Sequence, residues 1–169
     1  MIKGAIFDVD GTLLDSMGIW KDVGVRYLNS IGIEAEPDLG TILFTMSILE
    51  QQYIEYLPLL VIEMIETDEI EQNVLDIISD YYKETAPLKS GAVELLEKLR
   101  NSNIPMTIAS SNNKKEIEMA FERLEIAKYF DRIFTCEEAG AGKTKPDIYL
   151  QAAEYLGSRP EETLVFEDV

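Results

Sequence analysis

The chain of 169 residues is long enough for about one ordinary domain, or for one core with a modest insertion. Hydrophobic residues make up 46% of it, which supports a real core and argues against global disorder. Acidic residues outnumber basic ones by 32 to 15, for a formal charge of −17, so we expect neither nucleic acid nor a membrane surface as a partner. Because this charge also repels phosphorylated compounds, such a substrate would need a bound cation and local lysines.

Residue counts exclude further classes of site. Cys136 is the only cysteine, which excludes an internal disulfide and fits a reducing compartment. The absence of histidine excludes zinc sites of the histidine type and Ser-His catalysis. Asp8 and Asp10 interrupt the first apolar run, so the N-terminus is not a signal peptide, and charged residues and Pro58 break the apolar region 42–65. We therefore expect a cytoplasmic protein.

The chain begins with a predicted buried strand, whose apolar residues are Ile2, Ala5, Ile6 and Phe7. Asp8 and Asp10 follow at its carboxyl end and would share a face if the extended form continued. Gly11 comes next, where the backbone must turn or be approached closely. Two acids beside a glycine turn suit a site for a hard cation and a phosphate, although an ordinary strand-to-loop exit has the same composition.

A helical stretch follows, with no strand evident between Ser16 and Ala86. The apolar spacing predicts a helix from Ser16 to about Ser30, ending at Gly32. Further helical segments are predicted over 41–57, over 59–66 after Pro58, and over 68–84 with Thr67 as the cap. We interpret residues 16–86 as a helical insertion.

An alternating pattern resumes after the insertion. It predicts helices over 90–101, 114–124 and 146–156, and strands over 105–109, 132–136 and 163–167. Strands that alternate with helices indicate a parallel sheet covered on both faces. The predicted fold is α/β, a three-layer Rossmann-like core formed by residues 1–15 and 87–169 with an inserted α-helical cap.

The segment Phe-Asp-Val-Asp-Gly-Thr-Leu-Leu-Asp-Ser, residues 7–16, resembles the first motif of the haloacid dehalogenase superfamily, in its phosphatase and β-phosphoglucomutase-like branch. The resemblance implies that Asp8 is a nucleophile that forms an aspartyl phosphate and that Asp10 is the general acid/base. A carboxylate can attack phosphorus, and a second carboxyl can protonate the leaving oxygen. Dehalogenases of the superfamily lack the second acid, so Asp10 indicates phosphoryl transfer.

Residues 104–112 resemble the second motif, an apolar strand closed by a serine or threonine. The alignment places Ser110 at the motif serine, and the resemblance implies that Gly11, Ser110, Ser111 and Asn112 contribute to binding a phosphate. A hydroxyl and the backbone N–H groups of the next turn can hold phosphate oxygens. From the residues alone, capping of the following helix by 111–113 is the favoured interpretation.

Residues 140–149 contain Gly-Lys-Thr, which suggests a nucleotide P-loop, but that motif requires a glycine where this chain has Glu137. The stretch instead resembles the third motif, Gly-Lys-x-x-Pro-Asp-Ile-Tyr. This resemblance makes Lys143 the functional lysine and Lys145 a substitute two residues away. Either would neutralise charge on the transferring phosphoryl group and the aspartate.

Residues 164–168 resemble the fourth motif, a strand closed by two acids. The resemblance implies a Mg²⁺ site formed by Asp8, the backbone carbonyl of Asp10, and Asp168, with support from Glu167. A calcium loop of the EF-hand kind fails from Asp8 onward, because its glycine falls at position four and its twelfth residue is Ile19.

Similar proteins continue beyond the fourth motif, so we expect a partial chain with a weakened metal site. Its last strand would be an exposed sheet edge that promotes self-association.

The predicted function is Mg²⁺-dependent hydrolysis of a small phosphomonoester, such as a sugar phosphate or a phosphoglycolate-like compound. One alternative is a phosphosugar mutase, although Trp20 stands where β-phosphoglucomutases carry a cap histidine. Trp20 could belong to the cap core or form a wall of the substrate pocket. The other alternative is a catalytically silent binding protein of the same fold.

Overall fold

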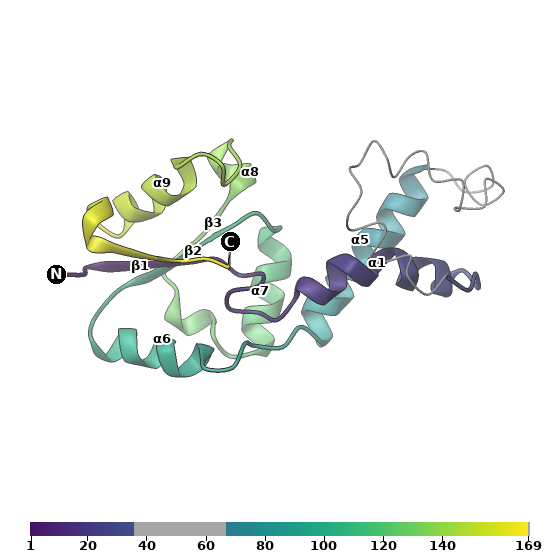
Figure 1. Cartoon of the computed structure of the whole chain (residues 1–169), viewed down its shortest axis with the longest axis horizontal. Coiled ribbons are helices and arrows are strands. Elements are labelled where there is room, and N and C mark those ends of the chain that lie inside the picture. Colours follow the sequence, from purple (N-terminus) through teal and green to yellow (C-terminus); the bar gives the residue numbers. More distant parts are fainter. Residues whose placement is uncertain (36–66, 169) are drawn as a thin grey trace. The chain divides into compact units, whose positions relative to one another are not determined.

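The computed structural model describes residues 1–35 and 67–168, drawn in colour in Figure 1, and the chain divides into two compact units. The first unit comprises Met1–Ser16 and Tyr82–Val169, and the second comprises Met17–Tyr81. The predicted core was 1–15 with 87–169, and the predicted insertion was 16–86. In the structure the helical unit ends at Tyr81 rather than at Ala86. Several residues expected in the insertion therefore belong to the unit that contains the sheet.

The first unit is built on a parallel four-stranded sheet in the order β3-β2-β1-β4. Its strands are β1 (Gly4–Phe7), β2 (Met106–Ser110), β3 (Ile133–Thr135) and β4 (Thr163–Phe166). Phe7 pairs with Ile108 of β2 and with Phe166 of β4, which aligns the carboxyl ends of the central strands. Ligand sites of open parallel sheets form at that edge. The predicted α/β class with a parallel sheet is confirmed.

Helices cover both faces of the sheet (Figure 1). Helix α9 (Asp147–Tyr155) lies on one face, and helices α6 (Ala92–Asn101) and α7 (Lys114–Arg123) lie on the other. Every residue of β1 and β2 is buried, as expected for strands with helices on both sides. One core cluster joins the sheet to α9 through Ile6, Ala109, Phe134, Ile148, Ala152 and Ala153. This packing fixes the ends of the strands that carry the candidate site.

The remaining elements of this unit are the 3-10 helices η1 (Ala127–Tyr129) and η2 (Pro160–Glu162) and the short helix α8 (Cys136–Ala139). The strand predicted over 132–136 is shorter in the structure, because only Ile133–Thr135 is extended and helix α8 begins at Cys136. The hydroxyl of Thr135 accepts a hydrogen bond from the backbone N–H of Glu138 at 3.2 Å, which caps a helix at Cys136. The strand therefore stops one residue before the cysteine.

The second unit contains helix α1 (Met17–Ser30) and most of helix α5 (Thr67–Glu84). Tyr27 and Leu28 of α1 are the buried centre of a cluster that also includes Val25, Ile31, Ile33, Ala35, Val74 and Ile77. Trp20 is 37% exposed, so it is not a fully buried core residue. The helices predicted over 41–57 and 59–66 lie outside the described residues.

Strand β4 lies at one edge of the described sheet, as predicted. Val165 is 47% exposed, while Leu164 and Phe166 are half-buried, and the Phe166 ring stacks on Phe7 with centroids 4.4 Å apart. Self-association through this edge stays a prediction. Among the helices of the described ranges, none combines the length and hydrophobicity needed to cross a membrane.

Candidate active site

The turn after β1 sets the positions of the first two candidate residues. The carbonyl oxygen of Val9 accepts hydrogen bonds from the backbone N–H groups of Leu13 and Leu14, and Gly11 adopts a φ of +79° within this tight loop. Such a positive φ suits glycine because it has no Cβ atom. Since the strand ends at Phe7, the extended form does not continue to Asp10. The condition under which Asp8 and Asp10 would share a strand face is therefore not met, and their carboxylates have separate partners.

Asp8 lies at the carboxyl end of β1 and is 6% exposed. The ammonium group of Lys143 lies 2.5 Å from its Oδ1 atom and 2.9 Å from Oε1 of Glu167, which follows β4. Burial raises the pKa of the Asp8 carboxyl to about 6, against the opposing effect of the hydrogen bond from Lys143. Burial disfavours the charged Lys143, but its hydrogen bonds to Asp8 and Glu167 outweigh this and raise its pKa. The lysine thus bridges two acids from neighbouring strands.

A third acid completes this cluster. One carboxylate oxygen from each of Asp8, Glu167 and Asp168 lies within 4.8 Å of the others. Hard oxygen donors at this spacing, one of them buried and one exposed, fit a Mg²⁺ ion that keeps several water ligands. The Asp10 carboxylate has other partners, and a contact of its backbone carbonyl with a metal ion stays a prediction.

The carboxylate of Asp10 accepts three side-chain hydrogen bonds from the first unit. Its Oδ1 atom accepts from the hydroxyl of Ser16 at 2.5 Å and from the phenol of Tyr82, and its Oδ2 atom accepts from the Asn112 amide at 3.0 Å. Ser16 and Tyr82 are both fully buried. The sequence analysis took Ser16 only as the start of a helix and missed Tyr82, because no local pattern links Tyr82 to a residue 72 positions away.

The end of β2 and the loop after it carry further predicted phosphate-binding residues, of which Asn112 contacts Asp10. The Ser110 hydroxyl is buried and accepts the backbone N–H of Asn112 at 3.1 Å. Ser111 is exposed, with its hydroxyl 3.4 Å from the sulfur of Cys136. The Asn113 side chain caps α7 by accepting from the N–H of Lys115. Helix capping therefore uses Asn113, while Asn112 contacts Asp10.

The structure separates the two lysines of the third motif. Lys143 contacts the acidic cluster, whereas Lys145 is exposed. Tyr149, four residues further on at the start of α9, donates its hydroxyl to Oε1 of Glu167. Burial, and then this hydrogen bond, raises the pKa of its phenol. Tyr149 is the last residue of the third motif, but the motif pattern does not assign it a role.

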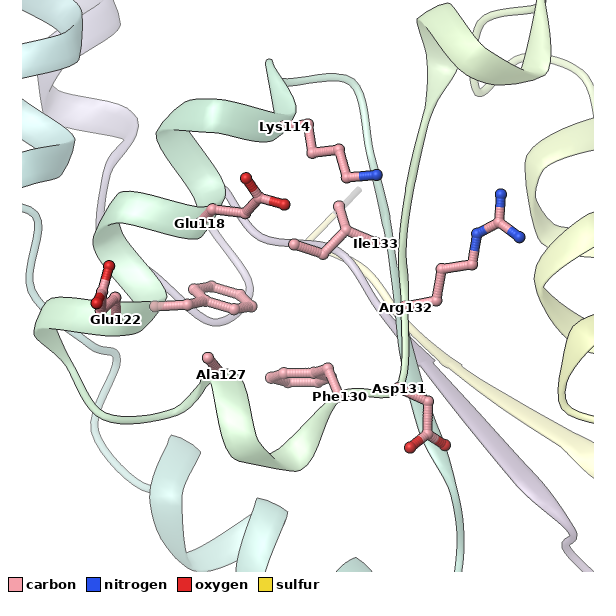
Figure 2. Close-up of a pocket in the computed structure, with 9 residues that line it drawn as sticks. Lys114, Glu118, Glu122, Ala127, Phe130, Asp131, Arg132 and Ile133 are labelled. Atoms are coloured by element: carbon pink, nitrogen blue, oxygen red, sulfur yellow. The ribbon is translucent and has the colours of Figure 1, made fainter.

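A separate cleft of about 680 Å³ lies between α7, η1 and β3 (Figure 2). The aromatic residues Phe121 and Phe130 line it, together with charged side chains that include Lys114 and Arg132. None of the predicted site residues line this cleft. The candidate active site is therefore the group of acids at the carboxyl ends of β1 and β4.

The fold and this site define a doubly wound α/β protein with a lysine-bridged acidic centre at the carboxyl edge of its sheet. Residues 2–169 match the haloacid dehalogenase-like hydrolases, and the chain belongs to that family. It is 29% identical to a phosphorylated carbohydrates phosphatase of Thermotoga maritima, covering 99% of this chain and 76% of that protein. It is 31% identical to hexitol phosphatase A of Escherichia coli, covering 98% and 74% of the two chains.

A solved structure from Thermotoga maritima, described as a candidate β-phosphoglucomutase, superposes with a TM-score of 0.81 at 26% identity. The alignment covers 97% of this chain and 75% of that one. The predicted family and fold are confirmed. The phosphatases among its relatives support the predicted enzyme class, a phosphoric monoester hydrolase.

Proposed function

We propose that this protein is a Mg²⁺-dependent phosphatase that hydrolyses a small phosphomonoester through an aspartyl phosphate on Asp8. The observation that carries the proposal is the buried Asp8 carboxylate, 2.5 Å from Lys143 and grouped with Glu167 and Asp168. A nucleophile, a cation to neutralise charge and a set of oxygen ligands are the parts that phosphoryl transfer needs. Sugar phosphates are the preferred substrate class, since relatives are named for phosphorylated carbohydrates and hexitols.

In the first step a carboxylate oxygen of Asp8 bonds to phosphorus, and the bond from phosphorus to the leaving oxygen breaks. Protonated Asp10 gives its proton to that oxygen, so the product leaves as an alcohol. Lys143 stays near the attacking carboxylate and offsets negative charge on the transferring group. The main-chain and side-chain donors of the 110–112 loop bind the phosphate oxygens.

In the second step Asp10, now a carboxylate, takes a proton from water as the water oxygen bonds to phosphorus. The bond between phosphorus and Asp8 breaks, which restores Asp8 and releases phosphate. The Asp10 side chain accepts three hydrogen bonds in the structure, and these keep it in one orientation through both steps.

Mg²⁺ would be held by Asp8, Asp168 and the backbone carbonyl of Asp10, with Glu167 in support. When bound, it supplies charge neutralisation for the phosphoryl group. The helical unit, Met17–Tyr81, would act as a cap that selects the substrate, and the protein would work in the cytoplasm.

The test is phosphate release from a chromogenic aryl phosphate and from hexose and hexitol phosphates, with and without Mg²⁺. We expect Mg²⁺-dependent turnover by the unaltered chain and loss of more than about a hundredfold in Asp8→Asn, the scale of an ordinary catalytic group. A thermal melt with Mg²⁺ checks that the variant is folded. Absent turnover in a folded, Mg²⁺-binding protein would favour the silent binding protein of the same fold.

A phosphosugar mutase is the second candidate, favoured by the similarity to the candidate β-phosphoglucomutase. Trp20 speaks against it, because it occupies the position at which the resemblance places the mutase histidine. Incubation with β-glucose 1-phosphate separates the two functions. A mutase would form glucose 6-phosphate, whereas a phosphatase would release inorganic phosphate.

A further inference from the structure

We propose that Tyr149 is a positioning residue that holds Glu167 in place, and through it Lys143, for metal binding at the acidic cluster. This inference rests on the proposed function. The Tyr149 phenol donates to Oε1 of Glu167, and the same oxygen lies 2.9 Å from the ammonium group of Lys143. Lys143 in turn lies 2.5 Å from Asp8. The four side chains therefore form one continuous chain of hydrogen bonds that ends at the proposed nucleophile.

Tyr149 is the member of this chain whose position is fixed by the hydrophobic core. It lies in the first turn of α9, and its side chain packs against the core cluster that joins α9 to the sheet. A tyrosine has two side-chain torsions and a rigid ring, so its hydroxyl is a fixed donor. Lys143 and Glu167 have long, flexible side chains on segments without helical structure. The rigid phenol thus sets the direction of the flexible glutamate.

The charges around Glu167 explain why a neutral donor is needed. Asp8, Glu167 and Asp168 place three carboxylates within 4.8 Å, and Lys143 contacts two of them. Without the phenol, Glu167 would be free to pair fully with Lys143 and to draw it away from Asp8. With the phenol on Oε1, the other oxygen of Glu167 remains available to a metal ion or to one of its water ligands.

The experiment measures Mg²⁺ binding calorimetrically, with MgCl₂ alone and no substrate, for the full chain and for Tyr149→Phe. The phenylalanine keeps the packed ring and removes only the hydroxyl. We expect roughly tenfold weaker Mg²⁺ binding, in the range measured when a residue that orients a metal ligand is lost. Tyr155→Phe is the matched control, because Tyr155 lies on the same helix and is 49% exposed. It should bind Mg²⁺ as the unaltered chain does.

A double-mutant cycle with Glu167→Ala tests whether Tyr149 acts through Glu167. In the Glu167→Ala background, Tyr149→Phe should cause no further loss of Mg²⁺ affinity, because the partner of the hydroxyl is gone. Unchanged or tighter Mg²⁺ binding in Tyr149→Phe, or losses that add in the double variant, would overturn the inference. So would an unaltered chain that binds no Mg²⁺. Failure of the proposed function appears separately, as absent phosphate release by an unaltered chain that does bind Mg²⁺.

Discussion

A Cβ atom at Gly11 would lie 2.0 Å from Oδ2 of Asp168. The turn that follows β1 therefore packs directly against a carboxylate of the acidic cluster, and glycine is required there for space as well as for its φ of +79°. The glycine of the first motif and the acid of the fourth motif, which are far apart in the sequence, are in contact through this packing.

Gly11→Ala should displace Asp168 and weaken Mg²⁺ binding by roughly 10–100-fold, the range for disturbed metal-ligand orientation. Gly157→Ala separates backbone strain from this clash. Gly157 also has a positive φ, +64°, but no heavy atom of the described residues lies within 4 Å of the place that a Cβ would take there. Gly157→Ala should therefore lower Tm by roughly 2–8 °C, from a backbone strain of about 1–2 kcal/mol, and should leave the Mg²⁺ affinity unchanged. Equal Mg²⁺ affinity in the two variants would show that the contact with Asp168 is unimportant.

Lys143→Ala should reduce turnover by roughly 10²–10³-fold, because it removes the cation that lies 2.5 Å from Asp8. Lys145→Ala, two residues away on an exposed side chain, should keep nearly full activity and serves as the control. Steady-state kinetics with one sugar phosphate measures both. A larger loss in Lys145→Ala would mean that Lys145, not Lys143, approaches the phosphoryl group during the reaction.

Tyr82→Phe should reduce turnover by roughly tenfold, because one of the hydrogen bonds that orient the Asp10 side chain is lost. The loss should be greater for alkyl phosphates than for aryl phosphates, since poor leaving groups depend most on the acid. Tyr129→Phe is the control, because it removes a similar hydroxyl-to-carboxylate bond, to Glu97, without touching the site. If both substrate classes lost the same fraction of rate, Tyr82 would have no part in orienting Asp10.

The lowered pKa of Glu162 predicts how the free energy of unfolding depends on pH. Hydrogen bonds from Arg159, and then from Lys3, lower its pKa from 4.5 to about 2. A carboxyl with a depressed pKa in the folded state contributes stability above its unfolded value, and this contribution is lost as the pH falls toward the folded value. Glu162→Gln should therefore be less stable than the unaltered chain at pH 7, with a difference that shrinks between pH 4.5 and 2.

Urea denaturation followed by circular dichroism at pH 7, 5, 4 and 3 measures this difference. Glu161→Gln is the control, since Glu161 is an exposed neighbour whose ion pair with Arg159 is also exposed. A deficit in Glu162→Gln that stayed constant down to pH 3 would show that it arises from packing rather than from charge.

The fold class was predictable from the amino-acid sequence and is confirmed by the parallel sheet, while the roles of the candidate site residues stay predictions. Strands buried on both faces appear in the sequence as short apolar runs. In a parallel sheet, the polar residues that follow these runs lie together at the carboxyl edge. Asp8 and Ser110 stand at the ends of such runs, but it was the resemblance to the family's motifs that selected Asp8, Ser110, Lys143 and Glu167. The end of the strand before Cys136 was missed, because the capping by Thr135 competes locally with an extended pattern.

The contacts between these side chains became known only from the three-dimensional structure. It places Lys143 rather than Lys145 against Asp8 and Glu167, gives the Asp10 carboxylate partners outside the acidic cluster, and brings Tyr82 to Asp10 and Tyr149 to Glu167. The residues joined by these contacts are far apart in the sequence. Lys143 and Lys145, by contrast, differ by only two positions in one loop, yet only Lys143 reaches the acids. The geometry of these contacts depends on the packing of α9 and on the turn at Gly11, and no pattern of neighbouring residues encodes the distance between two such side chains.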